Sequence, residues 1–175
     1  MNEDSASRIE IRRARVDEWR TIRRLRLRAL REDPLAFGST YAREEAFDDS
    51  VWIERTEHGA RSAESSQWVA LDSRGNLLGL ATVAEVDGND HLFGMWVAPE
   101  SRRRGIGTRL LDRATDWSRS THPGRPLILE VNPQQAAAVA LYESRGFQYT
   151  GVERPLGHTE GQVVREMVLR ERTGP

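Results

Sequence analysis

Residues 98–114 read APESRRRGIGTRLLDRA, and this stretch decides how the rest of the chain is interpreted. Three arginines and two glycines stand directly before apolar residues at helical spacing, which predicts a helix from about Ile106 to Ser120. The start of a helix exposes unpaired backbone N–H groups and carries partial positive charge, so it binds phosphate where glycine lets the backbone come close. The sequence therefore predicts an anion site at Arg102–Thr108, formed by backbone amides and helped by the arginine side chains.

Two better-known phosphate loops do not fit this stretch. A Walker A loop needs a lysine after its last glycine, and the chain contains no lysine, so that all 26 basic residues are arginine. A dinucleotide-binding loop needs a third glycine where Leu110 stands. On spacing alone, a basic and solvent-exposed helix start is an equally good interpretation.

The composition is that of one globular protein. The chain has 175 residues, a formal net charge of −1, 38% hydrophobic residues and no cysteine. We expect a single domain at residues 8–171 between short tails at 1–7 and 172–175. The charge predicts neither nucleic-acid nor membrane partners, the lack of cysteine excludes disulfides and thiol chemistry, and we expect no metal site. The N-terminus has no apolar segment, which predicts a cytoplasmic protein without a signal peptide or membrane span.

Periodicity along the chain predicts an α/β fold, with a mixed sheet and helices on both faces. Helices are expected at 18–33, 41–56, 106–120 and 134–146, and strands at 8–16, 91–99, 126–132, 147–153 and 163–171. A hairpin is expected at 67–86, with Gly75 and Asn76 tolerating positive φ in its turn. Asp17 is expected to cap the first helix and Pro34 to end it.

One face of the first helix is rich in arginine. Its basic residues are Arg20, Arg23, Arg24, Arg28 and Arg31. They suggest a nucleic-acid contact, but a solvated helix face in a chain without lysine would look the same. The near-neutral charge and the lack of a helix-turn-helix partner favour the solvated face.

A second stretch, LEVNPQQAAAVALYESRGF at 129–147, carries a family resemblance. Together with MWVAPESRRRGIGTRLL at 95–111, it closely resembles the GNAT superfamily of acyl-CoA-dependent N-acyltransferases. In that family an [Arg/Gln]-x-x-Gly-x-[Gly/Ala] loop holds the pyrophosphate of coenzyme A, and a later A-x-x-LY-x-x-x-GF pattern follows. The matching residues are Arg102, Gly105, Gly107, Ala138, Leu141, Tyr142, Gly146 and Phe147. The resemblance implies a single-domain GNAT-like α+β fold with a mixed, mostly antiparallel sheet of about seven strands.

The resemblance also implies an acetyl-CoA site. A bulge would splay one strand away from the next, so that its backbone pairs with pantetheine and the N–H of Val97 or Met95 stabilises an oxyanion. Gln135 stands where many members carry asparagine, and Asn132 is a candidate substitute. The expected cofactor-binding residues are Met95, Trp96, Val97, Arg102, Arg103, Arg104, Gly105, Ile106, Gly107, Thr108, Asn132 and Gln135.

Acyl transfer to an amine needs a neutral amine, a stabilised oxyanion and a proton for the departing thiolate. By resemblance, Tyr142 is the general acid, and the alternative is a core tyrosine packed beside Leu141. Glu130 occupies the position used by members that acetylate protein α-amines, and His91 falls where histone-acetylating members carry glutamate. Either residue, or a water relay, is a candidate general base; both residues are equally open to a purely structural role.

The acceptor is expected to be a primary amine of a small molecule, a metabolite or an antibiotic, as in bacterial members of the family. Candidate substrate-binding residues are Phe37, Ser39, Tyr41 and Glu44, with His158 either near the site or solvated. One alternative is acetylation of protein N-termini or lysines, and another is a non-catalytic CoA-binding module. A homodimer is common in the family.

Overall fold

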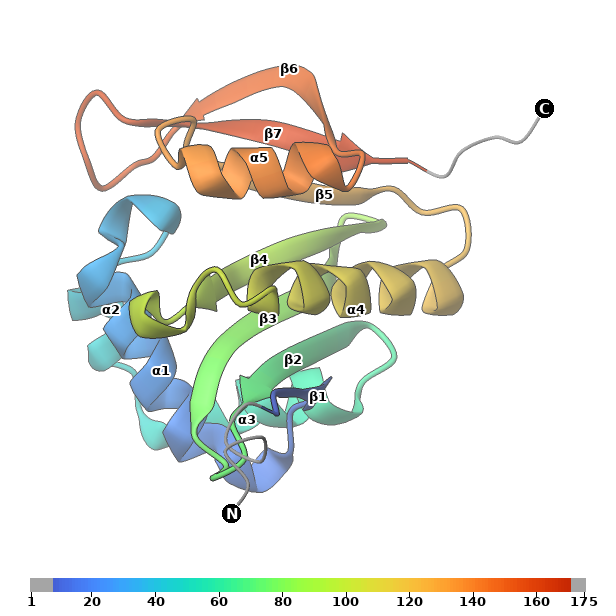
Figure 1. Ribbon diagram of the computed structural model, residues 1–175. Helices are drawn as coiled ribbons and strands as arrows, with labels where there is room; N and C mark the ends of the chain where they lie inside the picture. The colour runs from blue at the N-terminus through green and yellow to red at the C-terminus, as the bar shows by residue number, and fades with distance from the viewer. Residues whose placement is uncertain (1–7, 171–175) are drawn as a thin grey trace.

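The computed structural model describes residues 8–170, which form one twisted sheet of seven strands in the order β1-β2-β3-β4-β5-β7-β6 (Figure 1). The strands are β1 Glu10–Arg13, β2 Ser65–Leu71, β3 Leu77–Val86, β4 Asn89–Val97, β5 Leu127–Val131, β6 Gln148–Pro155 and β7 Val163–Leu169. All neighbouring strands are antiparallel except β4 and β5, which are parallel. The predicted mixed, mostly antiparallel sheet is confirmed, and the predicted tails lie outside the described residues.

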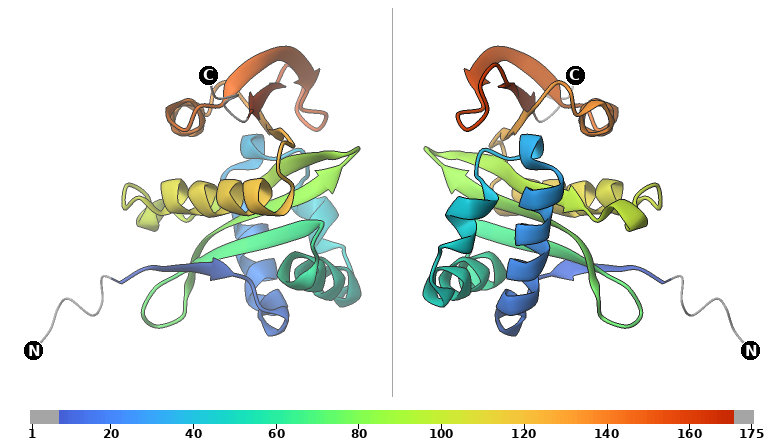
Figure 2. Two further views of the ribbon diagram at one scale, coloured as in Figure 1. Left: turned by 90° about the vertical axis from the view of Figure 1, so that its right-hand side faces the viewer. Right: turned by 90° about the vertical axis from the view of Figure 1, so that its left-hand side faces the viewer.

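Helices cover both faces of the sheet, as Figure 2 shows from two sides. One face carries α1 Trp19–Glu32, α2 Tyr41–Glu45 and α3 Asp49–Arg61, and the other carries α4 Ile106–Thr121 and α5 Ala136–Ser144. The connections between helices and strands include three short 3-10 turns: η2 Val16–Glu18, η3 Pro34–Ala36 and η4 Pro99–Ser101. Within residues 8–170, no helix has both the length and the apolar character needed to cross a bilayer.

The apolar periods explain how these helices pack. Leu110, Leu111 and Ala114 of α4 are each 0% exposed and form a core with the strands beneath them. Leu25 and Leu30 of α1 pack on the opposite face around Trp96. Helices α1 and α4 therefore each bury one stripe of apolar side chains and leave their charged faces to solvent.

Two details of the first third differ from the sequence prediction. The single helix expected at 41–56 is wrong: α2 ends at Glu45, and α3 starts after Asp48, whose extended backbone (φ −61°, ψ 154°) breaks the chain direction. The N-terminal cap expected at Asp17 is also wrong, because Asp17 lies inside η2 and α1 begins only after it. The end of α1 before Pro34 agrees with the prediction.

The strands β4 and β5 are paired over only a portion of their length. Asp90–Leu92 align with Leu127–Leu129, and beyond that point no pairing is recorded among the described residues. The register of β4 against β3 shifts between Leu80 and Thr82, and Gly94 has φ 59°. This is a β-bulge with glycine in the left-handed region, which increases twist and bends the strand. In Figure 1 the two strands diverge toward the end at which α4 begins.

Candidate active site

A cavity of about 500 Å³ lies where β4 and β5 diverge, bounded by the start of α4 and by α5. Of the expected cofactor residues, those on its wall are Met95, Trp96, Val97, Arg102, Arg103, Gly105, Ile106, Gly107, Thr108, Asn132 and Gln135. Glu130 and Tyr142 also line it. Segments far apart in the sequence therefore meet at one site.

The open edge of β4 presents backbone groups to this cavity. The N–H of Ala98 donates to the carbonyl of Leu78, on the β3 side. Since successive N–H groups of a strand point to opposite edges, the N–H of Val97 points toward the β5 side. The bulge also reverses which side chains face α4, because Leu92 packs in the α4 core whereas Trp96 packs against α1.

The loop before α4 has the backbone geometry of an anion site. Both Arg103 (φ 60°) and Gly105 (φ 71°) adopt the left-handed conformation. A non-glycine residue there costs about 1 kcal/mol, a strain that proteins keep mainly at functional sites. Within residues 8–170, the amides of Arg103–Thr108 have no hydrogen-bond acceptor, and the first bonded amide is that of Arg109, to the carbonyl of Gly105. The loop therefore offers a run of free donors at a helix start.

The arginines of this loop are not equivalent. Arg102 donates through Nε to the carbonyl of Val97 (2.9 Å) and through Nη2 to Asp33 (2.6 Å). Arg103 lines the cavity, whereas Arg104 does not. Sequence reasoning expected the same role for all three.

Tyr142 is held at the end of α5 by the LY-x-x-x-GF pattern. The N–H of Phe147 donates to the carbonyl of Tyr142 (3.1 Å) and that of Gly146 to Glu143 (3.0 Å), with Gly146 at φ 88°. This is a Schellman cap, and the rings of Tyr142 and Phe147, 5.8 Å apart, make its hydrophobic contact. Burial raises the pKa of Tyr142 to about 12. Among the described residues its hydroxyl has no hydrogen-bond partner, although it borders the cavity.

The two candidate bases lie in different places. Glu130 is on the cavity wall, and its carboxylate accepts from Arg154 of β6 at 2.5 Å. His91 does not line the cavity: it aligns with Ile128 in the paired segment of β4 and β5, and its ring stacks on Phe93. The structure thus places Glu130, and not His91, on the wall of the cavity that Tyr142 also lines.

Asn132 is 2% exposed and is used within the protein. Its side-chain amide donates to Gln162 (3.0 Å), and its oxygen accepts from the N–H of Gln134 (2.9 Å). Gln135 precedes α5 and makes no capping hydrogen bond with its side chain. Of the two residues, Gln135 is the one whose side chain is uncommitted.

None of the four candidate acceptor residues is among the residues that line the cavity. Phe37 is buried, and its carbonyl accepts from His158 Nε2 (2.7 Å), so the β6–β7 loop is tied to the segment after α1. Glu44 is 3% exposed and pairs with Arg26 at 2.8 Å. Burial raises the pKa of Glu44, but the hydrogen bonds from Arg26 and Ser39 and the charges of Arg26 and Arg55 together outweigh it and lower the pKa.

The remaining two acceptor candidates, Tyr41 and Ser39, are more exposed than Phe37 and Glu44. Tyr41 stacks against Arg31 (4.1 Å) and its hydroxyl donates to Glu45. Ser39 is half-buried. Because the carboxylate of Glu44 is already paired with Arg26, it is not a free acidic group that could attract an amine.

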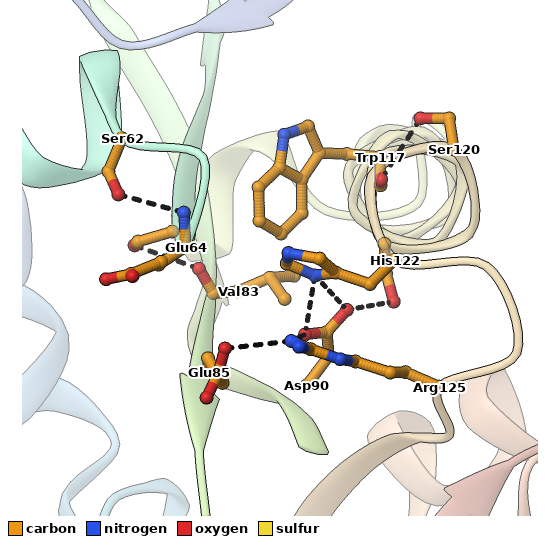
Figure 3. A network of polar contacts seen from close by, with 11 residues as sticks. Ser62, Glu64, Val83, Glu85, Asp90, Trp117, Ser120, His122 and Arg125 are labelled. Atoms are coloured by element: carbon orange, nitrogen blue, oxygen red, sulfur yellow. Dashed lines mark hydrogen bonds and ion pairs between the residues drawn. The ribbon is translucent and has the colours of Figure 1, made fainter. Parts of the chain in front are cut away.

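A second polar cluster lies at the paired end of β4 and is separate from this site (Figure 3). Asp90 is 0% exposed and accepts from Ser118 Oγ (2.6 Å), faces His122 Nδ1 (2.9 Å) and lies 3.7 Å from Arg125. Ser118 therefore bonds to the carboxylate and not to the imidazole, so the three residues do not have the Ser–His–Asp arrangement. This cluster joins the end of α4 to β4 rather than activating a nucleophile.

Several cavity residues were not predicted as site residues: Asp33, Ala36, Val131, Ala137, Ala138 and Leu141. Arg154, the partner of Glu130, was also missed. Asp33 and Arg154 come from segments that no motif joins to the cavity. Only the folded chain places Asp33 on the cavity wall and Arg154 against Glu130.

Comparison with known proteins places this geometry in a family. Residues 19–147 match the model of the acetyltransferase (GNAT) family. Streptothricin acetyltransferase of Streptomyces lavendulae is 36% identical over 96 residues, 54% of this chain and 50% of that protein. N-alpha-acetyltransferase RimI of Mycobacterium tuberculosis is 32% identical over 112 residues, 61% of this chain and 67% of that protein. The chain thus aligns with only half of the first of these relatives.

A solved structure has the same fold. Spermidine N-acetyltransferase from Vibrio cholerae, in complex with CoA and spermine, superposes with a TM-score of 0.74 and 22% identity. The superposition covers 94% of this chain and 96% of that protein. At this identity the likeness concerns the arrangement of helices and strands.

Proposed function

Because the chain belongs to the GNAT acetyltransferase family, we propose that it transfers the acetyl group of acetyl-CoA to a primary amine of a small molecule. The observation that carries this proposal is the cavity between β4 and β5, where free loop amides, the open edge of β4 and Tyr142 meet. Together these groups suit an acyl thioester with a diphosphate tail.

The residues present fit coenzyme A on two observations. First, the unpaired amides of Arg103–Thr108 form a run of donors at a positively charged helix start, which suits a diphosphate. Second, a Cβ on Gly107 would lie 3.4 Å from Leu141 and 3.6 Å from Met95, so glycine keeps this region of the cavity open. The diphosphate would rest on the loop, and the pantetheine would extend along the edge of β4. When bound, acetyl-CoA supplies the acetyl group and a thiolate leaving group.

The chain's own groups then have distinct tasks. The N–H of Val97, which points to the β5 side, stabilises negative charge on the carbonyl oxygen. Tyr142 donates a proton to the departing sulfur, and its pKa of about 12 keeps its hydroxyl protonated at neutral pH. Glu130 and Asp33 are the two carboxylates on the wall, and Glu130, once Arg154 releases it, removes the proton of the attacking amine directly or through water.

The first test is binding and turnover. Calorimetry with CoA is expected to show saturable binding. A thiol-release screen with acetyl-CoA over alkylamines, polyamines, aminoglycosides and peptides is expected to find at least one small-molecule acceptor. Lack of CoA binding at millimolar concentration would remove the proposal, and binding without thiol release from any acceptor would favour a non-catalytic CoA module.

A second candidate function is acetylation of a protein N-terminus. It is favoured by the 32% identity to N-alpha-acetyltransferase RimI and by Glu130 on the cavity wall. Peptides with free N-termini in the same screen separate the two functions. Transfer to peptides but not to small amines would replace the first candidate by the second.

A further inference from the structure

Asp33 connects three segments of the cavity wall. It is the C-terminal cap of α1, directly before Pro34, and it lines the cavity. Its Oδ2 accepts from Trp96 Nε1 at 2.6 Å and from Arg102 Nη2 at 2.6 Å. One carboxylate oxygen therefore joins α1, the unpaired half of β4 and the first arginine of the phosphate loop.

A carboxylate is an unexpected group at this place. The neighbouring cavity residues Arg102 and Arg103, with the loop amides, suit a ligand with negative charge. An acidic side chain there opposes the same ligand. The hydrogen bond from Trp96 does not require a charge either, because a neutral amide oxygen accepts an indole N–H equally well.

The two partners of Asp33 differ in how firmly they are held. The Trp96 side chain is buried in the core against α1, at 5% exposure. The Arg102 side chain is 44% exposed, and its Nε also donates to the carbonyl of Val97 at 2.9 Å. Trp96 thus keeps the carboxylate in place. Arg102 is the more exposed partner, and with Nε still bonded to Val97 it is the one able to exchange Asp33 for another anion at Nη2.

From this geometry we infer that Asp33 is a positioning residue that competes with the diphosphate of CoA for the guanidinium of Arg102. Asp33 pairs with Arg102 when the loop is empty. When the diphosphate binds, Arg102 pairs with the diphosphate instead, and it pairs with Asp33 again as CoA dissociates. The charge of Asp33 thereby lowers the affinity for the cofactor and favours release of the product. This inference rests on the proposed function, since it needs CoA to bind at this loop.

A neighbouring ion pair provides a matched control. Arg28 of α1 pairs with Glu100 through two hydrogen bonds of 2.8 Å, and Glu100 stands two residues before Arg102. Both carboxylates join α1 to the same loop, but only Asp33 lines the cavity. Removal of either carboxylate changes the net charge by one unit, so Glu100, which is 60% exposed and outside the cavity wall, reports the effect of overall charge without loss of the contact to Arg102.

The test compares the binding of CoA, by calorimetry, to the wild type, Asp33→Asn and Glu100→Gln. Asparagine keeps an acceptor for Trp96 and removes the charge from Arg102. We expect Asp33→Asn to bind CoA about two- to fivefold more tightly, the range for a partly exposed ion pair, and Glu100→Gln to bind like the wild type. Pantetheine, which lacks the diphosphate, should bind equally to all three proteins. Asp33→Ser removes the charge by a second route and should agree with Asp33→Asn.

The outcomes separate the two proposals. If the wild type does not bind CoA, the proposed function fails and this inference fails with it. If the wild type binds CoA but Asp33→Asn binds it equally or more weakly, only the inference is overturned. Equal tightening by Glu100→Gln, or tighter binding of pantetheine, would likewise overturn it, because neither depends on competition for Arg102.

Discussion

Arg154 of β6 lies against Glu130 of β5, with 2.5 Å between Nη1 and Oε1, although β7 separates the two strands in the sheet. The reason lies in the register of β5 and β7, in which Glu130 is directly opposite Glu166. Like charges at opposite positions destabilise a sheet. Arg154, which is also 3.4 Å from Glu166, reduces this repulsion, but one guanidinium leaves the two carboxylates with a net negative charge beside the cavity.

Arg154→Gln is expected to lower the KM of a cationic acceptor. Loss of the guanidinium exposes Glu130 and increases the negative charge that an ammonium meets as it enters. Because the ion pair is partly exposed, we expect the KM to fall about two- to fivefold. Steady-state kinetics with the acceptor found by thiol release would measure it.

The same hairpin offers a control for this variant. Arg165 of β7 pairs with Glu153 of β6 at 2.8 Å, and neither residue lines the cavity. Arg165→Gln changes the net charge by the same amount and should leave the KM unchanged. A similar fall in both variants would mean that overall charge, and not the contact with Glu130, controls acceptor binding.

Tyr142→Phe should lower kcat at least tenfold, within the usual range for loss of a general acid, with little change in the affinity for CoA. The hydroxyl has no partner among the described residues, so its removal should not disturb the Schellman cap or the packing on Phe147. Single-turnover rates and CoA calorimetry measure the two effects. Parallel loss of rate and binding would show that Tyr142 is only structural.

Tyr142→Phe should also reduce the loss of folding stability at alkaline pH. Burial raises the pKa of Tyr142 from its usual 10 to about 12 in the folded protein. Below pH 10 the Tyr142 hydroxyl is neutral in both the folded and the unfolded protein. Between about pH 10 and 12 it ionises in the unfolded chain but not in the folded protein, which favours unfolding. The wild type should therefore lose more stability across this interval than Tyr142→Phe, in urea titrations at pH 9 and about pH 11. An equal loss of unfolding free energy between the two pH values in the wild type and in Tyr142→Phe would contradict a tyrosine that is buried and neutral in the folded protein.

The features of the site that sequence reasoning predicted are local. The free amides of Arg103–Thr108 follow from glycine spacing before a helical pattern, and the cap at Gly146 follows from the residues within one turn of it. Helix and strand periods likewise predicted the sheet and its covering, because a buried stripe repeats at the period of its element.

Contacts between distant segments escaped prediction. Asp33 reaches Arg102 only because α1 crosses the unpaired half of β4, and no pattern of either segment encodes that distance. The break between α2 and α3 was missed since helical apolar spacing continues through it; the adjacent Asp48 and Asp49 were the available sign of a new helix start. His91 was placed by resemblance, whereas its position depends on where β4 and β5 stop pairing.

Gly105→Ala and Gly107→Ala should differ in their effects. Gly105 has φ 71°, so alanine there costs about 1–2 kcal/mol or shifts the loop amides, and CoA binding should weaken with the loss of stability. Gly107 lies in the helix, and its added Cβ meets only ordinary contacts of 3.4 Å or more. Urea titration should therefore show a smaller loss for Gly107→Ala. Equal destabilisation would mean that the left-handed turn at Gly105 is not required.

Asp90→Asn is expected to destabilise the protein without changing its affinity for CoA. The carboxylate is fully buried and has Ser118, His122 and Arg125 as partners, so loss of its charge should cost about 2–3 kcal/mol. In a protein of this size that corresponds to a Tm lowered by roughly 5–10 °C. The control is Glu85→Gln, which removes only the exposed partner of Arg125 and should change the Tm little. Asp90 lies where β4 and β5 are still paired, away from the cavity, so calorimetry should give the same CoA affinity for both variants. Weaker CoA binding by Asp90→Asn alone would contradict this. It would show that the paired end of β4 controls how far the two strands diverge.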